Sequence, residues 1–169
     1  NRERALEDIM KSIGCVFRLA IVVTVSLVCV PGMGYSKDMG GWEKEGAYNK
    51  LYKASELDKL KCRVKKVTEV VPMKGMSPGI ALIADDGDGE KFMVHIGPKW
   101  YLGSSTGITR GDKFKIRGSW VEIDGEDVFI ASKIKKGDYF ELKARLTKDV
   151  TPFWTMTHEE LAHELAQKK

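Results

Sequence analysis

Cysteine and histidine are scarce in this sequence. Its 169 residues include three cysteines (Cys15, Cys29 and Cys62) and three histidines. Two of the cysteines lie in the first 35 residues, so the rest of the chain has Cys62 alone and cannot close an internal disulfide. The core must therefore hold the fold without crosslinks. We interpret Cys62 as a small apolar residue on a strand, with intermolecular pairing as the alternative.

Long apolar runs are lacking too. The most extended one, residues 19–30, covers 12 residues, whereas a membrane-spanning helix needs roughly 20. Lys11 and Arg18 precede this run, and Pro31 and small residues follow it. The pattern predicts a secretory signal over residues 1–35, cleaved near Tyr35, with an uncleaved N-terminal membrane anchor as the alternative. We therefore expect a periplasmic protein, or one anchored in the inner membrane and facing the periplasm.

An excess of one charge is also missing. The formal net charge is +4, with 43% hydrophobic and 31% charged residues. This composition is typical of a globular protein. A net charge this small, with both signs mixed along the chain, does not by itself indicate nucleic-acid binding.

What the sequence does contain is period-two alternation after Leu60, which predicts short strands separated by Gly and Asp turns in a barrel that spans residues 57–150. The first strand is long, and a slip at Lys65 and Lys66 predicts a bulge. Gly118 interrupts a later strand, as is common where a barrel turns a corner. The predicted fold is all-β, a small OB-fold-like Greek-key barrel of five to six strands. Residues 36–56 form an arm with large aromatic residues as anchors, and residues 151–169 form a loop and a short helix.

Several motifs together resemble exported bacterial OB-fold proteins, in particular the group that holds magnetosome-associated members, and more distantly the periplasmic OB-fold stress proteins. The resemblance covers residues 42–154, and its motifs are Trp42, residues 48–52, residues 72–79, residues 94–98, residues 100–102, Gly111 with Asp112, Gly118 with Ser119, Ile130 with Ala131, and Pro152 with Trp154. It implies a periplasmic, non-enzymatic binding or assembly module, and it brings no catalytic residues with it.

The histidines and acidic turns do not form a recognisable reaction centre. His158 and His163 lie five residues apart, about 140° around a helix, so they cannot readily share a metal. The acidic residues 85–90 fail the calcium-loop pattern because position 96 is Ile. His95 alone does not make a metal or proton-transfer site. With no nucleophile–base pair visible, we predict no enzyme activity, no catalytic residue, no metal site and no cofactor.

The candidate ligand-binding residues lie on and beside the predicted strands. They are His95, Trp100, Tyr101, Trp120, Lys113, Lys115 and Arg117. Rings and cations in this arrangement could form a stacking platform of the kind that OB-folds use. In the alternative interpretation the rings fill the barrel and the lysines form its solvated face.

The main functional hypothesis is therefore a binding or assembly module for a protein, peptide or cell-envelope ligand, possibly as an accessory subunit of an envelope complex. One alternative is a metal-handling or redox accessory protein that uses His95, Cys62 or the methionines Met73, Met76 and Met93. A further alternative is an OB-fold that binds single-stranded nucleic acid, although nucleic acid is scarce in the periplasm.

Overall fold

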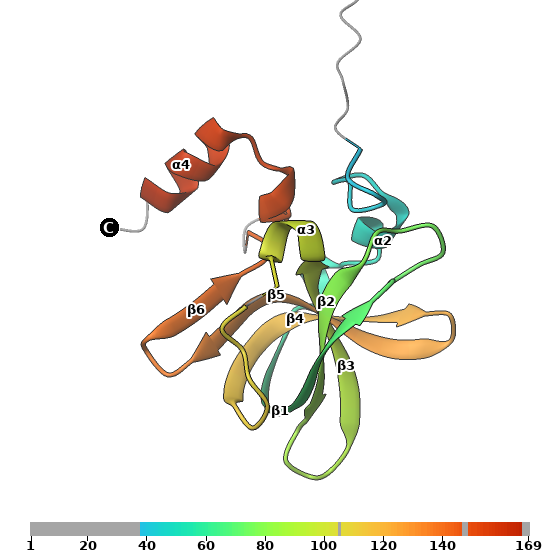
Figure 1. The fold of residues 1–169 in the computed structure, drawn as a ribbon, viewed down its shortest axis with the longest axis vertical. Helices are drawn as coiled ribbons and strands as arrows, with labels where there is room; N and C mark the ends of the chain where they lie inside the picture. Colours follow the sequence, from blue (N-terminus) through green and yellow to red (C-terminus); the bar gives the residue numbers. More distant parts are fainter. Residues whose placement is uncertain (1–37, 105, 147–148, 167–169) are drawn as a thin grey trace, which may run out of the picture. The chain divides into compact units, whose positions relative to one another are not determined.

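The structure is a computed structural model that describes residues 38–104, 106–146 and 149–166 (Figure 1). The predicted signal or anchor helix lies outside these residues. Within the described ranges, no helix is long and apolar enough to cross a membrane.

The fold is mostly β, with six strands in one sheet in the order β3-β2-β1-β4-β5-β6. The strands are β1 (Asp58–Val70), β2 (Gly79–Asp85), β3 (Lys91–Pro98), β4 (Lys113–Ile123), β5 (Glu126–Lys136) and β6 (Phe140–Lys143). The helices are α2 (Ala47–Lys50), α3 (Lys99–Leu102) and α4 (His158–Ala166), with two short 3-10 turns, η1 (Ala54–Glu56) and η2 (Phe153–Thr155).

Five of the strands pair in a ring. β1 pairs antiparallel with β2 and β4, β2 with β3, and β4 with β5. A short parallel pairing of β3 with β5 joins the remaining two edges. The pairings therefore run from β1 through β2, β3, β5 and β4 back to β1, and we call these five strands the strand ring. β6 pairs antiparallel with residues 133–136 of β5, after the part of β5 that pairs with β3.

The irregularities predicted from the sequence are confirmed. The β1–β2 register shifts between Val64 and Lys66, which is the predicted bulge, and the β4–β5 register shifts between Arg117 and Gly118. The last strand, β6, ends at Lys143. Arg145 is buried and forms an isolated bridge with Pro152 instead, so the chain leaves the sheet there.

The arm before β1 packs on the strand ring together with the loop after β6. Trp42 and Trp154 are both buried, with ring centroids 5.7 Å apart in an edge-to-face arrangement. The two indoles lie over glycines at the ends of β2 and β3, since a Cβ on Gly79 would come within 2.6 Å of Trp42 and one on Gly97 within 2.8 Å of Trp154. The buried rings of Trp42, Tyr48 and Tyr52 confirm that the arm is anchored by its aromatic residues.

Candidate functional site

Eight basic side chains gather on the outward side of β1, β4 and β5. Alternate residues of these strands point to solvent while the residues between them are buried, as in Lys61 beside Cys62 and Lys115 beside Phe114 and Ile116. We call this surface the basic face, and its members are Lys59, Lys61, Arg63, Lys113, Lys115, Arg117, Lys133 and Lys135.

The register of the sheet places these like charges directly opposite one another. Across β1 and β4 the pairs are Lys59 with Arg117, Lys61 with Lys115, and Arg63 with Lys113. Across β4 and β5 they are Lys115 with Lys135 and Arg117 with Lys133. Directly opposed like charges destabilise a sheet. The basic face is thus maintained at a cost in folding free energy.

The basic face is also hollowed. One hollow of about 710 Å³ lies along Lys61, Arg63, Lys113 and Lys115. At the end of β2 and at the turn after β5 its wall also includes the carboxylates of Asp85, Asp86 and Asp138. A second hollow of about 520 Å³ continues from the first toward Lys59. Both are lined by Lys61, Lys115 and Lys135, so together they form one continuous basic groove.

Within the part of the chain that the structure describes, ion pairs of the basic face are found on β5, and Arg63 on β1 lies opposite Asp85 in the sheet. Glu141 on β6 forms an ion pair with Lys135 at 2.8 Å and with Lys133 at 3.7 Å. Among the described residues, no ion pair is found for the other six members of the basic face. Ligands that bring carboxylates to β1 and β4 would therefore meet cations that no ion pair occupies.

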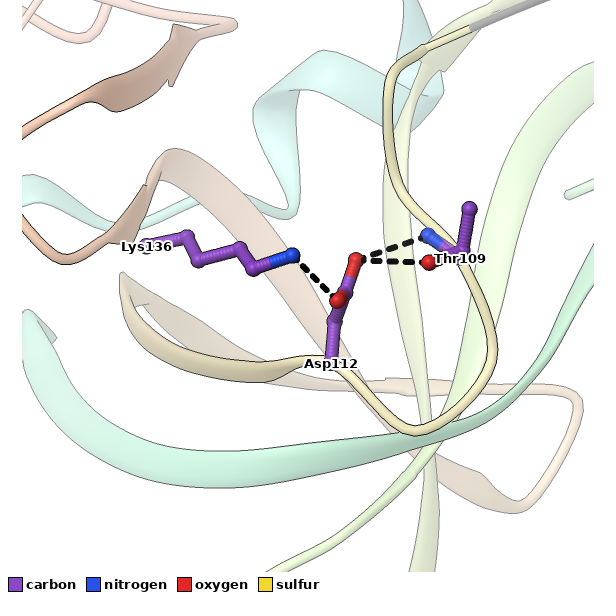
Figure 2. Close-up of polar contacts among 3 residues, drawn as sticks. All are labelled: Thr109, Asp112 and Lys136. Atoms are coloured by element: carbon purple, nitrogen blue, oxygen red, sulfur yellow. Dashed lines mark hydrogen bonds and ion pairs between the residues drawn. The ribbon is translucent and has the colours of Figure 1, made fainter.

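Asp112 fixes the start of β4 and binds Lys136 at the end of β5 (Figure 2). Its carboxylate accepts hydrogen bonds from the Thr109 amide at 2.9 Å and from the Thr109 hydroxyl at 3.0 Å, and it pairs with Lys136. The bond to Lys136 holds the pKa of Asp112 below its usual range. The Val64 amide also donates to the Asp112 carbonyl at 2.9 Å. The loop before Lys113 is thereby bonded to the bulge in β1.

The predicted site residues fall in four separate places, the last of which is the buried position of His95. Lys113, Lys115 and Arg117 lie on the basic face as predicted for one strand. Trp100 and Tyr101 lie on α3 and are 43% and 38% exposed, and the Tyr101 ring contacts Trp154 rather than the groove. The proposed platform of four rings is divided, because Trp120 on β4 packs on the fully buried Phe129 and not on the α3 rings.

His95 lies inside the fold. It is 2% exposed, its Nδ1 lies 3.1 Å from the Tyr48 hydroxyl, and its Nε2 lies 3.3 Å from the Met93 sulfur. Burial lowers the pKa of His95 to about 4 and raises that of Tyr48, so the imidazole is neutral and the phenol is protonated at neutral pH. This residue joins the arm to β3 and does not face the groove.

The buried imidazole predicts a specific loss of stability in acid. Between pH 6.5, the ordinary His pKa, and about pH 4 the unfolded chain binds a proton that the folded chain does not. The free energy of unfolding should therefore fall by about 3 kcal/mol as pH drops through this window. His95→Gln, which cannot titrate, should show a much flatter dependence in urea denaturation at pH 7 and pH 4.5. Equal pH slopes for the two proteins would contradict this assignment.

Arg145 is a buried cation whose partners are rings and an amide. Its Cζ lies 5.0 Å from the ring centroids of both Tyr52 and Trp154, and its Nη2 donates to Asn49 Oδ1 at 2.6 Å. Desolvation lowers its pKa. The amide of Asn49 in turn donates to the Trp42 carbonyl at 3.0 Å. The guanidinium therefore clamps the arm to the loop after β6, a structural role in which it is shielded from ligands.

The residues of the metal and redox alternatives are buried or partly buried. Within the described residues, no group of three or more His, Cys, Asp or Glu side chains is placed to hold a metal ion. Cys62 is buried on β1, and burial raises the pKa of its thiol to about 11. Met73 and Met76 are partly buried in the loop after β1 and pack on the hydrophobic core.

Sequence reasoning missed five members of the basic face, namely Lys59, Lys61, Arg63, Lys133 and Lys135. The signal was present, because basic residues alternate in Lys59-x-Lys61-x-Arg63 as they do in Lys113-x-Lys115-x-Arg117. What the alternation could not show is that β1 and β5 flank β4 and present the same side.

The basic face lies entirely within the part of the chain that matches a known family. The model of the MamS/MamX magnetosome protein family matches residues 56–140, about half of the chain, and this span holds the strand ring. No curated protein and no solved structure matches the chain. On the extent of the family match, the chain belongs to the MamS/MamX magnetosome protein family.

Proposed function

We propose that this domain is a non-enzymatic binding and assembly module, an OB-fold barrel whose basic face docks an acidic polypeptide surface. The OB-fold assignment is supported by the ring order of the pairings, by the long first strand with its bulge, and by the parallel contact between β3 and β5. Closure of a sheet on itself also removes exposed edges, which accounts for the strongly buried β2 and β5.

The observation that carries the proposal is the array of opposed cations across β1, β4 and β5. Five pairs of basic residues face each other at adjacent strand positions. Successive outward residues lie roughly 7 Å apart along a strand, and neighbouring strands lie about 5 Å apart. Carboxylates that dock on a surface with this density of positive charge relieve the repulsion between its basic side chains. The free energy that this repulsion costs in the unbound protein then contributes to binding.

A polypeptide fits the basic groove better than single-stranded nucleic acid. Proteins that bind single strands set aromatic rings among the cations so that bases stack on them. Here the exposed rings Trp100 and Tyr101 are on α3, and the one ring that lines the groove, Phe114, is 3% exposed. The groove offers charge without a stacking surface, which suits carboxylates.

We further propose that the domain acts outside the cytoplasm, as an accessory subunit of an envelope or magnetosome-membrane complex. The apolar run at residues 19–30 and its basic flank support export or anchoring. Membership of a magnetosome family supports an assembly role next to a membrane.

The test is binding of a short poly-glutamate peptide to the purified full chain, measured by calorimetry or fluorescence anisotropy. The variant Lys61→Glu/Lys115→Glu should weaken binding by about 100-fold or more, because each reversal turns an attraction into a repulsion. The matched control, Lys50→Glu/Lys74→Glu, makes the same change in net charge at exposed lysines away from the groove. It should bind nearly as well as the wild type.

Two results would contradict the proposal. One is equal weakening by both variants, which would mean that only net charge matters. The other is binding of oligothymidylate at the groove with no binding of poly-glutamate, which would favour the nucleic-acid alternative.

A further inference from the structure

A second charged surface is formed by two hairpins, whose tips project from the strand ring in different directions in Figure 1. The turn between β2 and β3 and the turn between β4 and β5, with the strand ends beside them, carry exposed carboxylates. We call this surface the acidic end, and its members are Asp86, Asp88, Glu90, Glu122, Asp124, Glu126 and Asp127. Among the described residues none of these seven forms an ion pair.

An aromatic anchor lies at the centre of the acidic end. A hollow of about 420 Å³ between the hairpins is lined by Trp120 and Phe92. Around the two rings lie Asp86, Glu90 and Asp127, together with one lysine, Lys91. Trp120 is 37% exposed, and its ring is held 5.3 Å from Phe92 and 5.2 Å from Phe129 between centroids. A rigid tryptophan surrounded by polar groups is the usual composition of an interface hot spot, and its face can also receive a Lys or Arg side chain.

The two surfaces together gather about a third of the basic residues and a third of the acidic residues of the domain. Residues 1–37 hold 5 of the 28 Lys and Arg and 3 of the 24 Asp and Glu, so residues 38–169 carry 23 − 21 = +2. Eight of the 23 basic residues are on the basic face and seven of the 21 acidic residues are at the acidic end. Two copies of a nearly neutral domain attract each other at short range when one surface is basic and another is acidic.

The two surfaces also share a border. Leu60 lines both the basic groove and the hollow of the acidic end, and Asp86 lines the other part of the groove as well as that hollow. A two-fold axis near this border would place the basic groove of each copy on the acidic end of the other. Two-fold interfaces in which patch i meets patch j, and patch j meets patch i, are the commonest in soluble oligomers.

We infer that the acidic polypeptide surface that docks in the basic groove is the acidic end of a second copy of this chain, in a closed two-fold dimer. This inference rests on the proposed function of the groove and names its occupant. Trp120 of each copy would lie against lysines of the other. The charges of the basic face and of the acidic end would then be neutralised in the same interface. Other acidic proteins would compete for the same groove.

The experiment is a charge swap on the full chain in a mild detergent, with mass measured by sedimentation or light scattering. The groove variant is Lys61→Glu/Lys115→Glu and the end variant is Asp86→Lys/Asp127→Lys, all at exposed positions. Wild type should have twice the mass of the chain at low salt, and each variant alone should have a dissociation constant raised by about 100-fold or more. An equimolar mixture should regain the double mass, because every contact is again between opposite charges.

The inference is overturned if the wild type has the mass of a single chain, if either variant alone keeps the double mass, or if the mixture does not recover it. Association through the apolar N-terminal run would appear as dimers of both variants and would therefore count against it. Poly-glutamate binding separates this failure from that of the proposed function. If the wild type is a monomer that binds poly-glutamate, and the groove variant does not bind it, only the self-docking is contradicted. If the wild type neither forms a dimer nor binds poly-glutamate, the groove itself is contradicted as a binding site.

Discussion

Gly118→Val should lower the free energy of unfolding by at least about 4 kcal/mol or prevent folding, because it forces a side chain into a space that backbone occupies. A Cβ at position 118 would lie 2.1 Å from the Ile130 carbonyl oxygen and 2.6 Å from Cε1 of Phe129. Gly118 stands where the β4–β5 register shifts, so the two strands approach most closely there. Moving them apart would disturb the ring of pairings on both sides.

The measurement for Gly118 is denaturation by urea, monitored by circular dichroism. The matched control is Glu122→Val on the same strand, where the side chain is exposed. That substitution should change the free energy of unfolding by about 0.5 kcal/mol or less. A Gly118→Val protein that unfolds within about 1 kcal/mol of the wild type would contradict the close approach of β4 and β5.

Trp154→Ala should cost about 3–5 kcal/mol, the usual range for removing a buried aromatic ring. The Trp154 indole packs edge-to-face on Trp42, forms one of the two ring faces around Arg145, and donates from Nε1 to the Trp42 carbonyl at 2.9 Å. Its loss leaves a cavity and a buried guanidinium with one face uncovered. The arm should then exchange its amide hydrogens faster, because this contact links it to the end of the chain.

Trp100→Ala provides the comparison for Trp154. The Trp100 ring is 43% exposed and lies 6.3 Å from Tyr101 between centroids. Its removal should cost about 1 kcal/mol, since an exposed aromatic pair contributes little beyond its buried area. Equal losses for the two variants would show that the arm is not held by the buried indole.

Much of the fold could be predicted because its signals are local. The bulge at Lys65 shows as a slip in the alternation of β1, and the corner at Gly118 shows as a glycine inside a strong strand pattern. The packing of the arm could be predicted because three large aromatic rings in a polar segment are expected to be buried against the rest of the domain. Thr157 precedes the last helix and is a residue type that favours the cap position, and its hydroxyl accepts a hydrogen bond from the Glu160 amide at 3.2 Å.

Other features depend on residues that are far apart in the sequence, and these could not be predicted. Asn49 and Arg145 are 96 positions apart, yet they form one bond at the base of the arm. Nothing in the residues near Arg145 indicates that its side chain is buried. The basic face depends in the same way on the neighbours of β4, which alternation alone does not identify.

The most direct measurement of the central claim is the affinity of the full chain for poly-glutamate as a function of salt. Charges on an exposed groove are screened over about 8 Å at physiological ionic strength and over much longer distances at low salt. We expect tight binding at low salt that weakens steadily as salt is added, and no binding of a poly-lysine peptide by the groove. Affinity that does not change with salt, or that is equal for the acidic and basic peptides, would contradict a groove built from opposed cations.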